Sequence, residues 1–130
     1  MSDWLDFEKM IARVYQTISP RALVKHNDSI QGMDSGIERQ IDVSVRFKEA
    51  GCAFLIIVQA KNYKNPADIN VVGEFATVIK DVRASKGVLI CNAGFTQGAQ
   101  QLAISLGIDL CTAHDAETKD WRAILTIPVV

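Results

Sequence analysis

The stretch that decides the fold runs from Gly36 to Tyr63 and reads GIERQIDVSVRFKEAGCAFLIIVQAKNY. From Gln40 to Lys48 apolar and polar residues alternate, which is typical of a half-buried β-strand. The alternation assigns four apolar residues to one face: Ile41, Val43, Val45 and Phe47. From Ala53 to Ala60 nearly every residue is apolar, which indicates a central strand covered on both faces. The stretch therefore predicts two neighbouring strands joined by a short turn.

The length of that turn predicts which residues of the two strands face each other. A four-residue hairpin loop from Glu49 to Cys52 gives a register in which Asp42 faces Gln59 and Gln40 faces Lys61. Residues directly opposite one another have Cβ atoms about 5 Å apart. A carboxylate, an amide and an ammonium group are thus expected to meet at the end of the hairpin farthest from the turn. A slip of one residue would separate them.

Length and composition limit the classes of protein that this chain can form. With 130 residues, of which 48% are hydrophobic, we expect a single domain over residues 1–130 with a substantial core. The net charge of −1 counts against nucleic acid as a partner but leaves room for a local basic cleft. The sequence has no signal peptide and no apolar run long enough to cross a membrane, so a cytoplasmic location is expected. Three cysteines without metal-ligand spacing are expected to be buried free thiols: Cys52, Cys91 and Cys111.

The periodicity of the rest of the chain predicts three helices and four further strands. Helices are expected over 1–17, from Pro66 or Asp68 to the Lys86-Gly87 pair, and from a Thr96 cap to Gly107. The further strands are expected over 22–30, 87–91, 108–111 and 123–129. Loops join the early strands and helices join the later ones. The order αβββαβαββ therefore predicts an α/β fold whose central sheet is mixed, antiparallel at first and then parallel, with helices on both faces.

Four short motifs, taken in this order of elements, resemble a known family. They are Glu8 in the first helix, RQIDV at 39–43, QAK at 59–61, and GVLICNAGFTQGA at 87–99 followed by LGI at 106–108. Over nearly its whole length the chain resembles the PD-(D/E)XK nuclease superfamily, and within it the Mrr-like restriction endonucleases. The resemblance implies a restriction-endonuclease-like three-layer α/β/α fold and hydrolysis of DNA, as in host defence.

The chemistry of phosphodiester hydrolysis gives a role to each polar residue of the motifs. It needs a metal ion, here Mg²⁺ or Mn²⁺, held by hard oxygen ligands, and a cation near the attacking water. Asp42 can supply a carboxylate and Gln59 its side-chain oxygen, and the resemblance implies that the backbone carbonyl of Ala60 also faces the metal. Lys61 would position the nucleophile or stabilise the transition state. Glu8 would contribute from the first helix, through a bound water or a second metal position.

Two positions depart from the superfamily's pattern. Ile41 stands in place of the proline, and Gln59 stands in place of an acidic residue, as it does in the Mrr-like branch. The second change removes a negative charge from the metal site. A nuclease-fold module that binds DNA or protein without cutting is therefore the main alternative.

Other polar residues have less specific interpretations. Arg39 contacts phosphate or pairs with Glu38 or Asp34, and Lys64 touches the nucleic-acid backbone or is ordinary surface. The two histidines, His26 and His114, stand in unrelated contexts, which favours structural roles over catalytic ones.

A second class of function rests on the unit formed by the 87–91 strand and the helix after it. Its start, with Gly94, Thr96 and Gly98, could bind a phosphate or nucleotide, although the spacing matches no dinucleotide or P-loop motif and Thr96 as an N-cap explains it more simply. For a nuclease, the chain offers no helix-turn-helix or zinc element for reading DNA. Specificity is therefore expected from a separate subunit or domain or from a homodimer, and cutting both strands would need a dimer or two events.

Overall fold

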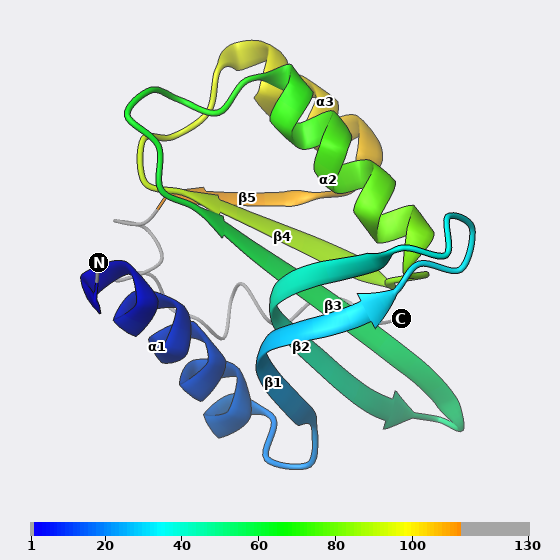
Figure 1. Ribbon diagram of the computed structural model, residues 1–130. Helices are drawn as coiled ribbons and strands as arrows, with labels where there is room; N and C mark the ends of the chain where they lie inside the picture. Colours follow the sequence, from blue (N-terminus) through cyan, green and yellow to red (C-terminus); the bar gives the residue numbers. More distant parts are fainter. Residues whose placement is uncertain (1, 113–130) are drawn as a thin grey trace.

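The structure is a computed structural model that describes residues 2–112 and contains a five-stranded sheet between helices (Figure 1). The predicted 123–129 strand and His114 lie outside the described residues. The helices are α1 (Ser2–Ile18), α2 (Ile69–Asp81) and α3 (Gln97–Leu106). The strands are β1 (Leu23–Gln31), β2 (Glu38–Glu49), β3 (Cys52–Lys61), β4 (Lys86–Cys91) and β5 (Asp109–Thr112). None of the described helices is long and apolar enough to cross a membrane.

The sheet is mixed, as the order of elements predicted. Its strand order is β1-β2-β3-β4-β5. Strands β1, β2 and β3 pair antiparallel through short connections. Strands β3, β4 and β5 pair parallel, because helices α2 and α3 carry the chain back to the same end of the sheet each time. The fold class α/β is confirmed.

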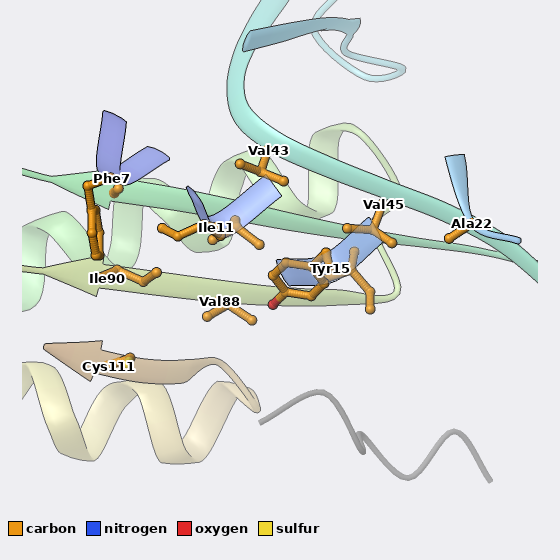
Figure 2. Close-up of a cluster of buried hydrophobic side chains, with 12 residues drawn as sticks. Phe7, Ile11, Tyr15, Ala22, Val43, Val45, Val88, Ile90 and Cys111 are labelled. Atoms are coloured by element: carbon orange, nitrogen blue, oxygen red, sulfur yellow. The ribbon is translucent and has the colours of Figure 1, made fainter. Parts of the chain in front are cut away.

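Two apolar clusters on opposite faces of the sheet make up the core. Phe7, Ile11 and Tyr15 of α1 pack on one face, against side chains of four strands that Figure 2 shows in close-up. The other face carries α2 and α3, whose Phe75 and Ala99 belong to a cluster with Ile57. The central strand β3 supplies residues to both clusters, which explains why its sequence is almost wholly apolar. The predicted three layers are therefore present.

The turn between β2 and β3 is shorter than predicted. The register is the predicted one as far as Val43–Val58, where the ladder stops before the predicted Gln40–Lys61 pair. Only Ala50 and Gly51 form the turn, and both have positive φ, 52° and 79°. Two left-handed residues match the right-handed twist of the strands, which lets Glu49 and Cys52 pair instead of belonging to the loop. The predicted length of four residues was wrong. The observed loop is shorter by one residue at each end, so the pairing of the strands is the same.

Two other expectations are corrected. Helix α2 ends at Asp81 and not at the Lys86-Gly87 pair, because Arg83 adopts a left-handed φ of 60° that a helix cannot continue. Gly87 lies inside β4, where a Cβ would come within 2.3 Å of Ile79 Cδ1, so glycine allows α2 to approach the sheet closely. Cys52 is exposed beside the turn, whereas Cys91 and Cys111 are buried as expected.

Strand β2 turns over in its middle: residues two apart in the sequence, Ile41 and Val43, face opposite sides of the sheet. The alternation of its sequence did not predict this. Val43 packs in the cluster under α1, but Ile41 packs in the cluster under α2 and α3. The pairing of β1 with β2 is interrupted at this point, between His26–Val43 and Asp28–Ile41, where Asn27 has a φ of 59°. A left-handed residue in the edge strand changes the direction of both strands locally. In Figure 1 the first half of β2 accordingly bends away from β3.

Candidate active site

The candidate site lies where β2 and β3 separate. The paired residues of these strands run from Glu49–Cys52 as far as Val43–Val58. Beyond that pair, side chains connect the strands. The backbone N–H of Asp42 donates to Gln59 Oε1 at 2.8 Å, and the N–H of Ala60 donates to Asp42 Oδ2 at 2.7 Å. Gln59 Nε2 also donates to the carbonyl of Gln40 at 3.1 Å. The predicted meeting of Asp42 and Gln59 is therefore present.

These contacts give Gln59 a structural role besides any role toward a metal. Its amide group accepts from one residue of β2 and donates to another, so it holds β2 in place of the missing backbone ladder. Both atoms of a neutral amide are needed, since a carboxylate at this position could not donate to the Gln40 carbonyl. An acidic residue at this position would leave the Gln40 carbonyl without this donor.

Asp42 is a half-buried carboxylate whose charge is incompletely balanced. Burial raises the pKa of its carboxyl group above the ordinary value, and the negative charge of Glu8 raises it further. The hydrogen bond from Ala60 and the positive charges of Lys61 and His26 act in the opposite direction without offsetting the rise. Glu8, Lys61 and His26 therefore come from three separate elements to lie within electrostatic reach of Asp42.

Glu8 lies on α1 and contacts the sheet through a histidine. Its Oε1 is 3.2 Å from His26 Nε2 on β1, and the two side chains are 17% and 23% exposed. His26 was interpreted as structural, and its contact with a candidate site residue was missed. A sequence signal for it would have required the pairing of β1 with β2. The irregular connection over 32–37 concealed that pairing.

The two candidate nucleic-acid contacts differ in their surroundings. Arg39 pairs with neither Glu38 nor Asp34: its Nε donates to Asp81 Oδ2 at 2.8 Å, at the end of α2. That contact occupies its guanidinium group with a nearly buried carboxylate, which accounts for Arg39 without a phosphate. Lys64 is exposed beside a shallow hollow of about 310 Å³ between β3 and α2, and its contact with nucleic acid stays a prediction.

The donor atoms present fit a hard divalent cation that is bound jointly by protein, water and substrate. Among residues 2–112 no group of three or more His, Cys, Asp or Glu side chains could hold a metal ion by itself. Mg²⁺ commonly takes only one or two protein carboxylates and fills its other positions with water and phosphate oxygens. Asp42 and Glu8 would supply those carboxylates. Burial, and after it the negative charge of Glu8, raise the pKa of Asp42, and a bound cation would act in the opposite direction.

Helix α3 carries the features of an ordinary helix start. The Thr96 side chain accepts a hydrogen bond from the N–H of Ala99, and Gly107 ends the helix with a left-handed φ of 73°. The Thr96 hydroxyl therefore serves as the predicted N-cap, and the nucleotide-binding alternative gains no support from this contact.

Comparison with known proteins identifies the family. The family model Mrr_cat, described as a restriction endonuclease, matches residues 1–116. The chain belongs to the Mrr-type restriction endonucleases. This assignment agrees with the resemblance drawn from the motifs. The contacts at the separation of β2 and β3 join Gln40 and Asp42 of RQIDV to Gln59 and Ala60 of QAK. None of the curated proteins compared matches the chain.

Solved structures share the fold of this Mrr-type domain. The protein of unknown function AF1548 is 20% identical with a TM-score of 0.69, and the match covers 94% of this chain and 64% of that one. The DNA modification-dependent restriction endonuclease AspBHI is 20% identical with a TM-score of 0.53, over 85% of this chain and 29% of that one. MspJI restriction endonuclease, in complex with a 27-mer oligonucleotide, is 18% identical with a TM-score of 0.55. The match covers 96% of this chain and 32% of that one. The Mrr-type domain thus spans about a third of the length of these two enzymes.

Proposed function

We propose that this chain is a Mg²⁺- or Mn²⁺-dependent endonuclease that hydrolyses phosphodiester bonds of DNA in the cytoplasm, for restriction of foreign DNA. The observation that carries the proposal is the position of Asp42. It lies where two strands separate, its pKa is raised, and the charges of Glu8 and Lys61 act on it. The family supports a nuclease of restriction type. The metal, the substrate and the activity are our inference.

Each residue of the site has a part that follows from its contacts. Bound metal would neutralise the phosphate and acidify a water molecule. Asp42 keeps its Oδ2 on the Ala60 amide, so the carboxylate is fixed in direction and its other oxygen is available to a cation. Gln59 holds the backbone of Asp42. Lys61 would place its ammonium group beside the attacking water or the developing charge. Glu8 would orient a second water or ion from α1.

The proposal assigns DNA reading to other parts of an assembly. AspBHI and MspJI, which this chain matches over about a third of their length, are named as restriction endonucleases, and one of them was solved with an oligonucleotide. A domain of this size with a net charge of −1 has little surface to read a sequence. We infer a separate specificity domain or subunit, and a homodimer where both strands are cut.

A plasmid cleavage assay tests the proposal. Wild type is incubated with supercoiled DNA, modified and unmodified, with Mg²⁺, Mn²⁺ or EDTA, beside Asp42→Asn, Lys61→Ala and the control Lys48→Ala. Lys48 is exposed on β2 at the turn end, far from the site. We expect nicking that needs metal, a loss of at least about 100-fold in Asp42→Asn and Lys61→Ala, and a rate within about twofold of wild type in Lys48→Ala. If folded wild type cleaves DNA under none of these conditions, the proposal that the chain is an enzyme is contradicted.

One observation favours a second function, binding without cleavage. Both atoms of the Gln59 amide are engaged in holding β2, which leaves the site with one charge fewer than the superfamily's pattern. Gel-shift measurements on the same variants separate the two functions. A binding module would retain DNA in wild type and in Lys61→Ala alike while cutting with neither.

A further inference from the structure

His26 contacts Glu8, a residue of the candidate site, although no motif includes it. It lies on β1 directly opposite Val43, just past the point where β2 turns over, and one residue before Asn27 with its left-handed φ. Its ring nitrogen Nε2 is 3.2 Å from Glu8 Oε1. Both side chains are mostly covered, so water competes little for the hydrogen bond.

Glu8 needs such a partner if it is to face the site. The backbone of α1 is fixed by the burial of Phe7 and Ile11 on either side of Glu8 in the sequence. The glutamate side chain itself has three rotatable bonds, and ordering it costs on the order of 1–2 kcal/mol of conformational free energy. The neighbouring negative charge of Asp42 also repels it. Without a restraint, Glu8 would turn toward solvent.

We infer that His26 is a positioning residue of the active site, which holds the Glu8 carboxylate toward Asp42 and thereby completes the site for a divalent cation. The Nε2–H of His26 donates to Glu8 Oε1. Within residues 2–112 the second oxygen of Glu8 makes no hydrogen bond, which leaves it for an ion or for a water bound to one. The inference rests on the proposed metal-dependent function and deepens it.

The arrangement corresponds to a known use of outer-sphere partners. Residues that hydrogen-bond to metal-binding side chains fix their direction, and their loss typically weakens metal affinity about 10–100-fold. Here the outer partner comes from β1, an edge strand that supplies none of the motif residues. The interruption of the β1–β2 ladder at Asn27 lies next to His26 on β1 and next to Asp42 on β2. The same irregularity of the sheet therefore adjoins both residues.

Calorimetric titration of Mn²⁺ into the DNA-free protein tests the inference with a readout other than cleavage. The variants are His26→Ala, His26→Gln, Glu8→Ala and the Glu8→Ala/His26→Ala double variant, with Lys25→Ala as a control that is exposed on the same strand. We expect His26→Ala to bind Mn²⁺ about tenfold more weakly, and His26→Gln to recover most of the affinity because its amide N–H can replace Nε2–H. The double variant should bind no more weakly than Glu8→Ala alone.

The possible results separate the inference from the function on which it rests. A wild type that binds neither Mn²⁺ nor Mg²⁺ without DNA overturns the inference that His26 and Glu8 complete a cation site. If that wild type also does not cut DNA, the proposed function falls with it. A wild type that binds metal, beside a folded His26→Ala variant that binds equally well, overturns only the inference. The same holds if His26→Ala weakens binding as much in the Glu8→Ala background as in wild type, since His26 would then not act through Glu8.

Discussion

Two carboxylates near the first half of β2 have opposite electrostatic surroundings. One is Asp81 of α2, which contacts Arg39, and the other is Asp42 of β2 itself. Asp81, at the end of α2, accepts from the Ser35 hydroxyl at 2.6 Å, from Arg39 Nε at 2.8 Å and from the backbone N–H groups of Asp34 and Ser35 at 3.0 Å. Asp42 accepts from the single N–H of Ala60 and lies near another carboxylate. The hydroxyl of Ser35 and the guanidinium of Arg39 hold the pKa of Asp81 well below its usual range, whereas burial raises that of Asp42.

The difference indicates what each carboxylate does. Asp81 has a full set of donors and fastens the 32–37 connection to α2. The fit is so close that a Cβ on Gly32 would lie 2.0 Å from Asp81 Oδ2. Asp42 has one hydrogen-bond donor, the Ala60 N–H, and the burial of its charge costs stability unless a cation balances it. A saturated buried carboxylate is therefore structural, and an unsaturated one at a strand separation is a candidate for chemistry.

The strongest test of this comparison is the stability of matched alanine variants. Asp81→Ala should lower the melting temperature by about 10 °C or more, because it leaves Arg39 and two backbone amides without their acceptor. Asp42→Ala should lower it far less, since one amide loses its partner while an unfavourable charge is removed. Thermal unfolding followed by circular dichroism measures both, with Glu74→Ala on the exposed side of α2 as a control. If the two variants lose equally in melting temperature, the distinction between a structural Asp81 and a functional Asp42 is contradicted.

The pH dependence of stability should differ in sign between the two carboxylates. The pKa of Asp81 is lowered in the folded protein, so its contribution is fully present above the ordinary value of 3.8 and is lost as the pH falls below it. Chemical unfolding between pH 3 and 7 should show the advantage of wild type over Asp81→Asn shrinking toward acid. An advantage that is constant over this range would contradict the assignment.

For Asp42 the direction reverses. Its pKa is raised in the folded protein, so the folded state holds the proton more tightly and stability falls as the pH rises from 3.8 through the folded pKa. Asp42→Asn, whose amide oxygen can still accept from Ala60, should therefore gain stability relative to metal-free wild type as the pH increases toward 7. Adding Mg²⁺ should stabilise wild type and not Asp42→Asn. If wild type is the more stable protein at neutral pH without metal, the charge on Asp42 is already compensated.

The smallest effect is expected at the exposed edge of the same connection. Arg83 donates to both oxygens of Asp34 at 2.8 and 3.0 Å, but the two side chains are 50% and 53% exposed. Exposed pairs contribute little because water and salt screen them. Arg83→Ala keeps the left-handed backbone and should change the melting temperature by less than about 2 °C. A larger fall would show that this pair, and not Asp81 alone, fastens the connection.

The hairpin was predictable because its signals are local. Alternation in β2, the apolar run of β3 and a short turn were enough to place Asp42 beside Gln59, and the error in turn length was symmetric and left the register intact. The contact between Arg39 and Asp81 was not predictable, because it joins residues 42 positions apart whose meeting depends on how α2 lies on the sheet. Of the expected partners, Asp34 contacts the same Asp81 carboxylate through its backbone N–H, while its own side chain pairs with Arg83.

The sequence by itself determined the order of elements, the mixed sheet, the hairpin register and the motifs of the family, since period, turn residues and short spacings act over a few residues. The tertiary structure alone decided that β2 turns over between Ile41 and Val43, that His26 reaches Glu8, and that Asp81 is saturated with donors while Asp42 is not. Those features depend on packing between distant segments. Burial and donor count, which set the charge balance of a carboxylate, exist only once the segments have come together.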